Sequence, residues 1–540
     1  MERRTARDVG MIQVGRPLNM LVVIAAVTMV TADIASSRVS ASQGAATASR
    51  SMPATQPGTR PVSRPAAGIS PAEYLRRQLK PTFRLGHTLP PLTRFGWTLP
   101  LDARVELAEH WGYALEFGGY ATTKLLDKEL DDANSISSKV LALAASDPNR
   151  YRLAVIVARD LPKDVPPETW TRDANGQLVE GKQIWSPEAP DSVFEEAGKL
   201  RADPLRRIRR KCPIAVVLNG GEYALGVCGF EQKAWSQDPR IVKAKGDQPW
   251  FDYVSQRKAR QELIITKAVR EAAPDRLLYI YYPCGGGIHR NRYGGWDQWG
   301  WGYQWMQNVS DLPSNELYYR SFNDGWTGNT DLATMALNAV GLEISLGRPL
   351  SYNWLCAGWT REKLGESAFS DIPRYMGFLK CCYTAGMIGG NAGYYAYPQG
   401  GFAVAFEPNA PPHWLEQMIA FARVHALFSH LEGFLREGDL LPGPDKHRWS
   451  KDMPAYEFPT GQAADRVVAR KMRKPPEWLI TSWAADGIDR QVKVTIPELG
   501  EVSLQARACG SVYRATLEKD KPVLRLIDED GLLPTKGPGR

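Results

Sequence analysis

Residues 215–225 of the chain read AVVLNGGEYAL. A short run of apolar residues ends at Asn219, and two glycines separate it from Glu222. Such a run is typical of a buried parallel strand, and paired glycines let the backbone and a ligand approach each other closely. Functional residues of α/β barrels lie at the C-terminal ends of strands. The stretch therefore predicts a parallel strand that ends in a candidate catalytic carboxylate, Glu222.

Similar apolar runs alternate with helical patterns over much of the chain. Eight strand–helix pairs over about 370 residues are what a (β/α)8 TIM barrel with inserted loops requires. We therefore expect an α/β fold with strands at 94–97, 113–117, 151–158, 215–222, 276–282, 316–322, 350–354 and 390–397. The predicted helices include 100–110, 132–145, 256–273, 331–346, 370–386 and 412–435.

After residue 475 the pattern changes to short, partly alternating segments separated by turn signals such as Asp486-Gly487. Such segments predict a small C-terminal all-β domain, a sandwich packed against the barrel. The expected division is a signal peptide at 1–35, a disordered linker at 36–70, the barrel at 71–470 and the β-sandwich at 471–540.

The first 69 residues carry much of the net charge of +8. They hold eight arginines against Glu2, Asp8 and Asp33, which leaves the rest of the chain nearly balanced and does not favour a nucleic-acid partner. A basic start before the apolar run Met20–Val30 is typical of a secretory signal. That run is shorter than the roughly 20 residues of a membrane span. We expect a secreted or periplasmic protein with no membrane span in its mature form.

Aromatic residues gather in the insertion after the fifth predicted strand, among glycines and polar residues. No helical or strand period would bury all of them, although packing in a loop core is the alternative for each. Flat aromatic faces can stack on sugar rings, while amide, imidazole and guanidinium groups bond hydroxyls. The candidate substrate-binding residues are Asn219, His289, Arg290, Tyr293, Trp296, Trp299, Trp301, Trp326 and Trp354.

Cleavage of a glycosidic bond normally needs two carboxyl groups. Glu222 is the first candidate. Asp324 follows the sixth predicted strand, although it could equally form a turn or cap a helix. Glu116 lies within the second strand, where a structural ion pair is the alternative, and Glu407 could reach the barrel mouth from a loop after the eighth.

A basic cluster precedes the fourth strand: Arg206, Arg207, Arg209, Arg210 and Lys211. Cations suit the C-terminal end of a helix, so a solvated helix end explains them. The alternative is a contact with phosphate or sulfate. Cys284 and His289 are too few ligands for a zinc site, so neither a metal nor a cofactor is expected.

Asn219-Gly220-Gly221-Glu222 resembles the Asn-Glu signature of the clan of retaining (β/α)8 glycoside hydrolases that includes agarases, β-galactosidases and cellulases. The resemblance implies that Glu222 is the acid/base and that Asn219 binds a hydroxyl. It also implies a nucleophilic glutamate at the end of strand seven, where residues 351–356 read SYNWLC and hold no carboxylate. Barrels that use strands four and six, as in the α-galactosidase-like clan, would pair Glu222 with Asp324.

The sequence thus predicts an exported glycoside hydrolase that acts on a polysaccharide or oligosaccharide. One alternative is a non-catalytic carbohydrate-binding barrel that lacks the second acid. The other is a polysaccharide lyase on the same fold, which could use Tyr282, His289 and Arg290.

Overall fold

The computed structural model describes twelve stretches of the chain: residues 69–94, 97–157, 162–220, 231–282, 305, 309–312, 350–353, 355, 372–390, 404–405, 413–447 and 450–527. The predicted signal peptide, the sixth strand and the helix at 331–346 lie outside these residues. Within them, no helix is long and apolar enough to cross a membrane.

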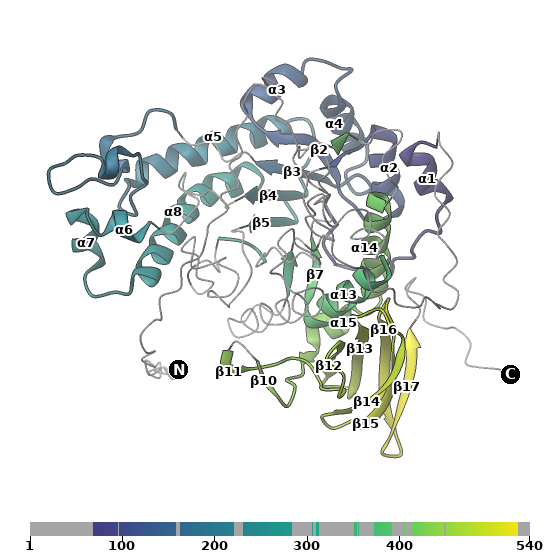
Figure 1. The fold of residues 1–540 in the computed structure, drawn as a ribbon. Coiled ribbons are helices and arrows are strands. Elements are labelled where there is room, and N and C mark those ends of the chain that lie inside the picture. The colour runs from purple at the N-terminus through teal and green to yellow at the C-terminus, as the bar shows by residue number, and fades with distance from the viewer. Residues whose placement is uncertain are drawn as a thin grey trace, which may run out of the picture. The chain divides into compact units, whose positions relative to one another are not determined.

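Four parallel strands form the centre of the fold (Figure 1). They are β2 (Leu115–Ala121), β3 (Leu153–Val157), β4 (Val216–Gly220) and β5 (Leu278–Tyr282), paired in that order. The register places Val157 opposite Asn219, which lies opposite Tyr281. Every residue of β3 is buried, as expected of a parallel strand covered on both faces.

Shorter segments extend this parallel run beyond β2. Leu92 forms a parallel bridge with Tyr113, and the amide of Thr93 donates to the carbonyl of Gly390 at 3.1 Å. Gly390 ends β7 (Met387–Gly390), which pairs in parallel with β6 (Ser351–Asn353). The neighbours therefore run β6, β7, the segment 92–93, β2, β3, β4 and β5.

Two predicted strands begin earlier in the chain than expected. The first begins at the paired residues 92–93 instead of residue 94. The amide of Arg94 donates to the side chain of Glu116 rather than to the ladder, and the chain pairs again in β1 (Trp97–Thr98), which runs parallel to β8 (Val404–Ala405). The eighth begins at Met387 instead of residue 390, since Gly389 continues the strand. A Cβ at Gly389 would lie 3.3 Å from the ring of Tyr352, so the glycine permits this packing.

Helices cover the strands on their outer side. The pair α5 (Asp191–Arg209) and α8 (Trp250–Ala272) runs side by side, and Gly198 allows close contact with Ile265 and Ala268 (Figure 1). α2 spans Leu101–His110. The helix predicted at 132–145 is α4 (Ile136–Ser146), which starts later than expected because Ser135 caps its N-terminus. A further helix that was not predicted, α3 (Thr123–Glu129), precedes it and is capped by Thr122.

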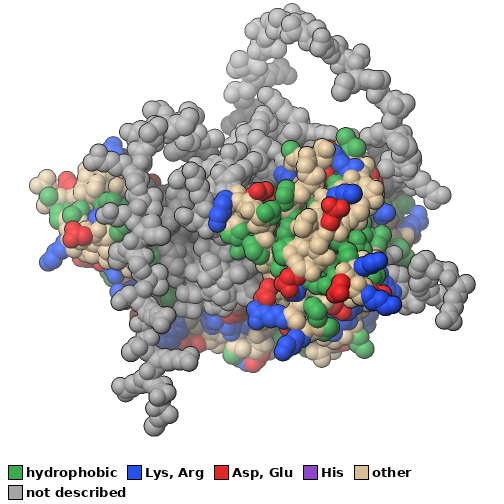
Figure 2. Space-filling view, turned by 90° about the horizontal axis from the view of Figure 1, so that it is seen from below, with side chains coloured by type: hydrophobic (Ala, Val, Ile, Leu, Met, Phe, Trp, Pro, Cys, Tyr) green, Lys and Arg blue, Asp and Glu red, His purple; other side chains and the backbone are tan. Residues whose placement is uncertain are grey.

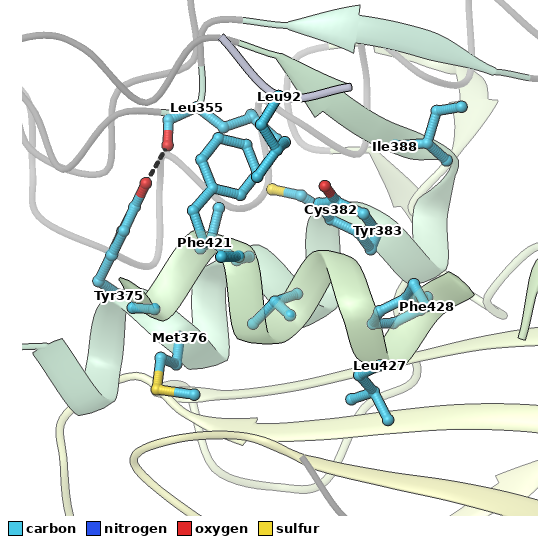
Figure 3. Close-up of a cluster of buried hydrophobic side chains, with 14 of the residues drawn as sticks. Leu92, Leu355, Tyr375, Met376, Cys382, Tyr383, Ile388, Phe421, Leu427 and Phe428 are labelled. Carbon is cyan, nitrogen blue, oxygen red and sulfur yellow. Dashed lines mark hydrogen bonds between the residues drawn. The ribbon is translucent and has the colours of Figure 1, made fainter. Parts of the chain in front are cut away.

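A second group of helices packs around α13 (Ile372–Ala385) and α14 (His413–Ser429), with α15 at Glu432–Glu437 and α1 at Pro71–Arg77. Figure 3 shows Phe421 of α14 beside Leu92 of the strand layer, and Tyr383 of α13 and Ile388 of β7 belong to the same buried cluster. The hydroxyl of Tyr375 donates to the carbonyl of Leu355. This core holds the segment 92–93 and β7 in place.

The C-terminal domain is all-β, as predicted. A five-stranded sheet has the order β17 (Lys521–Ile527), β16 (Ser511–Glu518), β13 (Glu477–Ala484), β12 (Asp465–Met472) and β9 (Asp439–Leu440). The hairpin β14 (Arg490–Ile496) and β15 (Gly500–Ala506) packs on it through a shared apolar cluster. Figure 2 shows basic and acidic side chains interspersed on the described part of one face.

The sheet starts before residue 471, the expected boundary, because β9 and β12 belong to it. β12 shows little alternation between buried and exposed positions, since its Arg470 is buried at 1% exposure. The guanidinium of Arg470 donates to the carbonyls of Thr384, Phe434, Leu435 and Gly438 at 2.8–3.3 Å. One side chain thus ties the β-domain to α13 and α15.

Candidate active site at the strand ends

β4 is the fourth of the parallel neighbours counted from the segment 92–93. It ends at Gly220, two residues before Glu222. Its last residues lie level with the ends of β3 and β5, because Val157, Asn219 and Tyr281 share one row of the register. The chain therefore leaves the sheet for Glu222 at an edge where neighbouring strands also end, which is the edge that carries function in α/β barrels.

Among the predicted site residues, the structure describes Glu116 and Asn219. The others lie outside the described residues: Glu222, Asp324, Glu407, His289, Arg290, Tyr293, Trp296, Trp299, Trp301, Trp326 and Trp354. Their roles stay predictions.

Glu116 is buried at 2% exposure beside Arg94. Its Oε1 accepts the backbone amide of Arg94, and its Oε2 lies 3.6 Å from the Arg94 guanidinium. Burial raises the pKa of Glu116 above its ordinary value, and the charges of Arg94 and Arg104 oppose that shift. A raised pKa suits a general acid. The contacts with Arg94, however, resemble the structural ion pair that the sequence left as the alternative.

Arg104 completes this buried group from α2. Its Nε donates to the carbonyl of Leu99 at 2.8 Å, and burial lowers the pKa of Arg104 to about 10. Arg94 and Arg104 together place two positive charges near one carboxyl group. This arrangement was not predictable from the sequence, because residues 94–97 have the pattern of a simple strand.

Asn219 faces the helix layer. Its side chain is fully buried, and its Oδ1 lies 3.2 Å from Nη1 of Arg201 on α5. The same Nη1 lies 3.8 Å from Oε2 of Glu262 on α8. This contact favours a role in packing β4 against α5 and α8, and binding of a sugar hydroxyl by Asn219 stays a prediction.

Glu116 and Asn219 lie on opposite faces of the sheet. Leu115 and Phe117 pack in the cluster under the outer helices, so Glu116 between them faces the other way. In the register Glu116 also lies level with Val216, three residues below Asn219, or about 10 Å along the strand. The two side chains therefore do not form one site.

Arg201 and Glu262 are not among the residues predicted from the sequence, although a signal for them is present. Arg201 falls in the apolar stripe of α5 with Phe194, Ala197 and Leu205, all fully buried. A charged residue at such a position predicts a buried partner, because an unpaired charge in a core is costly. Glu262 occupies an equivalent buried position on α8.

Two loops that leave the ends of β3 and β4 pack together into one lobe, which comprises residues 162–190 and 231–249. It includes α6 (Gln232–Trp235) and α7 (Pro239–Lys245). Trp235 Nε1 donates to the carbonyl of Trp185 at 2.8 Å. The lobe thus joins the two chain segments that border the predicted catalytic edge.

Asp238 is the centre of this lobe, with 1% exposure. Its carboxylate accepts the amide of Arg172 at 2.9 Å and the guanidinium of Arg240 at 2.7 Å. Burial alone would raise the pKa of Asp238, but these hydrogen bonds hold it below its ordinary value. Arg240 also donates to the carbonyl of Trp170 at 2.9 Å. A charged network therefore joins residues 170–172 to the start of α7, and so joins the two segments of the lobe.

Within the described ranges, no group of three or more His, Cys, Asp or Glu side chains could hold a metal ion.

No family model and no curated protein matches the sequence. Solved structures of glycoside hydrolases do resemble the chain. One is an Anoxybacillus α-amylase, with 8% identity over 81% of this chain and 91% of that one and a TM-score of 0.38. Another is the maltogenic α-amylase AmyB of Thermotoga neapolitana, with 9% identity over 70% of this chain and 77% of that one and a TM-score of 0.31. A third is the α-galactosidase AgaA of Geobacillus stearothermophilus, with 11% identity over 84% of this chain and 58% of that one and a TM-score of 0.34. These TM-scores are too low for the likeness to indicate a function.

Proposed function

We propose that the chain is an exported glycoside hydrolase whose residues 71–470 form a (β/α)8 barrel with Glu222 as the acid/base. The order of the parallel strands carries this proposal. In the described part of the chain, seven parallel strand segments lie side by side in the order that begins with β6 and ends with β5. Residues 283–349 separate these two outer strands in the sequence. One further strand there, as predicted at 316–322, would close the barrel and bring Asp324 to the same edge as Glu222.

The second carboxyl group decides the mechanism. The contacts of Glu116 with Arg94 leave Asp324 as the first choice and Glu407 as the second. Glu222 would protonate the leaving oxygen, and its partner would act as nucleophile or base. The predicted aromatic residues at 293–301 would bind the sugar rings.

A panel of neutral, sulfated and uronic polysaccharides tests the proposal on the full chain. We expect new reducing ends without ultraviolet absorbance from a new double bond. Products that carry the double bond would establish the lyase instead. Binding of a glycan without cleavage, across the panel, would establish the non-catalytic barrel.

A further inference from the structure

A groove of about 670 Å³ lies between the C-terminal turn of α5, the end of α8 and the start of α3. Four arginines of the basic cluster line it: Arg206, Arg207, Arg209 and Arg210. These ends of α5 and α8 lead into the starts of β4 and β5, whereas the candidate active site lies at the other ends of those strands, so the groove is separate from it.

Three of these arginines hold carboxylates that are easily displaced. Arg206 pairs with Asp203, Arg207 with Asp127 and Arg209 with Asp275, at 2.5–2.7 Å. The three aspartate side chains are 58–63% exposed, and exposed ion pairs contribute little because water and salt screen them. Arg210 is exposed and forms no ion pair with a described carboxylate. The groove can therefore offer several guanidinium groups to an incoming anion.

The spacing of the arginines suits a chain of separated anionic groups. Arg209 ends α5 and Arg210 is its C-cap; they follow Arg206 by three and four residues, so the side chain of Arg206 is a neighbour of both on the helix surface. A guanidinium fork matches the two oxygens of a carboxylate or sulfate group.

The other lining residues distinguish between classes of polyanion. Thr123 has a hydroxyl group, and Asp203 and Glu271 are carboxylates that can accept hydrogen bonds from sugar hydroxyls. These carboxylates repel any polyanion, and they disfavour duplex DNA most, because it carries one negative charge per roughly 1.7 Å and is bound chiefly through its phosphates. Among the described residues that line the groove, none is aromatic and able to stack on a base.

We propose that this groove is a second, non-catalytic site that binds an acidic polysaccharide. Its arginines bind uronate or sulfate groups, while Asp203, Glu271 and Thr123 bind hydroxyls. The site does not depend on the catalytic role of Glu222.

Calorimetric titration of the full chain with four polymers tests the site: polygalacturonate, dextran sulfate, neutral dextran and duplex DNA. The double variant Arg206→Gln/Arg210→Gln removes two charges from the groove. Arg473→Gln/Lys493→Gln removes two exposed, ion-paired charges from the β-domain and is the matched control. Thermal unfolding establishes that each variant folds.

We expect at least one of the two acidic polysaccharides to bind, and which one distinguishes uronate from sulfate recognition. The groove variant should lose at least tenfold in affinity, and the control variant no more than twofold. Four results would overturn the proposal: no binding of either acidic polymer, equal binding of neutral dextran, equal losses in both variants, or stronger binding of DNA that the groove variant abolishes. The last result would assign the groove to nucleic acid.

Discussion

The backbone amide of Arg94 donates to Oε1 of Glu116 at the position where the first parallel segment leaves β2. Before this point the ladder is regular, with Leu92 N bonded to the Gly112 carbonyl and Ala114 N to the Leu92 carbonyl. The carboxylate therefore replaces the next backbone acceptor, and the Arg94 guanidinium contacts its other oxygen. Glu116 stabilises the entry to the sheet.

Glu116→Ala should therefore destabilise the protein by about 3–5 kcal/mol, because it leaves the buried charge of Arg94 without its partner. Urea unfolding measures the loss. Glu73→Ala, which breaks the exposed pair with Arg77 on α1, is the control and should change stability by no more than about 0.5 kcal/mol. A loss below about 1 kcal/mol for Glu116→Ala would show that the pair is unimportant.

Glu432 should make the fold sensitive to acid. Burial alone would raise its pKa, but hydrogen bonds from Thr88, Arg436 and Arg84 lower the pKa of Glu432 to about 2. Because the folded value lies below the unfolded one near 4.5, the stabilisation is complete at neutral pH and is lost as pH falls toward 2. Between pH 7 and pH 3 this group should remove about 2 kcal/mol.

Glu432→Gln should remove that part of the acid dependence, measured as the unfolding free energy at pH 7 and pH 3. The exposed Glu437 lies on the same helix, so Glu437→Gln is the control and should keep the parent's slope. An unchanged slope in Glu432→Gln would contradict the assignment.

Two glycine-to-alanine changes should have opposite effects. A Cβ at Gly377 in α13 would lie 2.1 Å from Cδ1 of Trp483 and 2.7 Å from the Ala508 carbonyl. Gly377→Ala should therefore cost about 1–3 kcal/mol despite the better helix propensity of alanine. Gly433 in α15 has open space around its Cβ position, so Gly433→Ala should gain up to about 1 kcal/mol. Thermal unfolding compares them, and a stabilising Gly377→Ala would refute this packing.

The sequence predicted most strands of the described fold because parallel strands buried on both faces read as unbroken apolar runs. β3, β4 and β5 are such runs, and the C-terminal hairpins follow their turn signals. The exceptions have physical reasons. The glycine at 389 suggested that the strand starts at residue 390. Gly389 nevertheless lies inside β7, where it leaves room for the ring of Tyr352. β12 was not predicted, because the buried Arg470 interrupts its apolar pattern.

The candidate site was less predictable, because side-chain direction depends on the register of each strand. The residues directly before and after Asn219 on β4 face the other side of the sheet, where a ligand could bind. Asn219 itself faces the helices and contacts Arg201. The sequence is compatible with Glu116 as a catalytic acid or as one partner of a structural ion pair. The position of Arg94 in the structure favours the ion pair.

Arg470 should be intolerant of even a conservative change. Lysine cannot reproduce hydrogen bonds to four carbonyls, so Arg470→Lys should cost about 3 kcal/mol or more, since unsatisfied buried acceptors cost about 1–3 kcal/mol each. Arg473→Lys affects an exposed pair with Asp439 and should cost about 1 kcal/mol at most. Equal stabilities of the two variants, in urea, would show that Arg470 does not join the domains.

The turnover of Glu222→Gln, compared with that of Glu116→Gln, tests the central claim most directly. On a glycan that the parent protein cleaves, Glu222→Gln should lower kcat by about 10²–10⁴-fold, the usual contribution of a general acid, while both variants stay folded. The loss should be smaller for an aryl glycoside, whose leaving group needs no proton. Glu116→Gln should keep kcat within about tenfold, because its partner is Arg94. Parental turnover in Glu222→Gln would contradict the account.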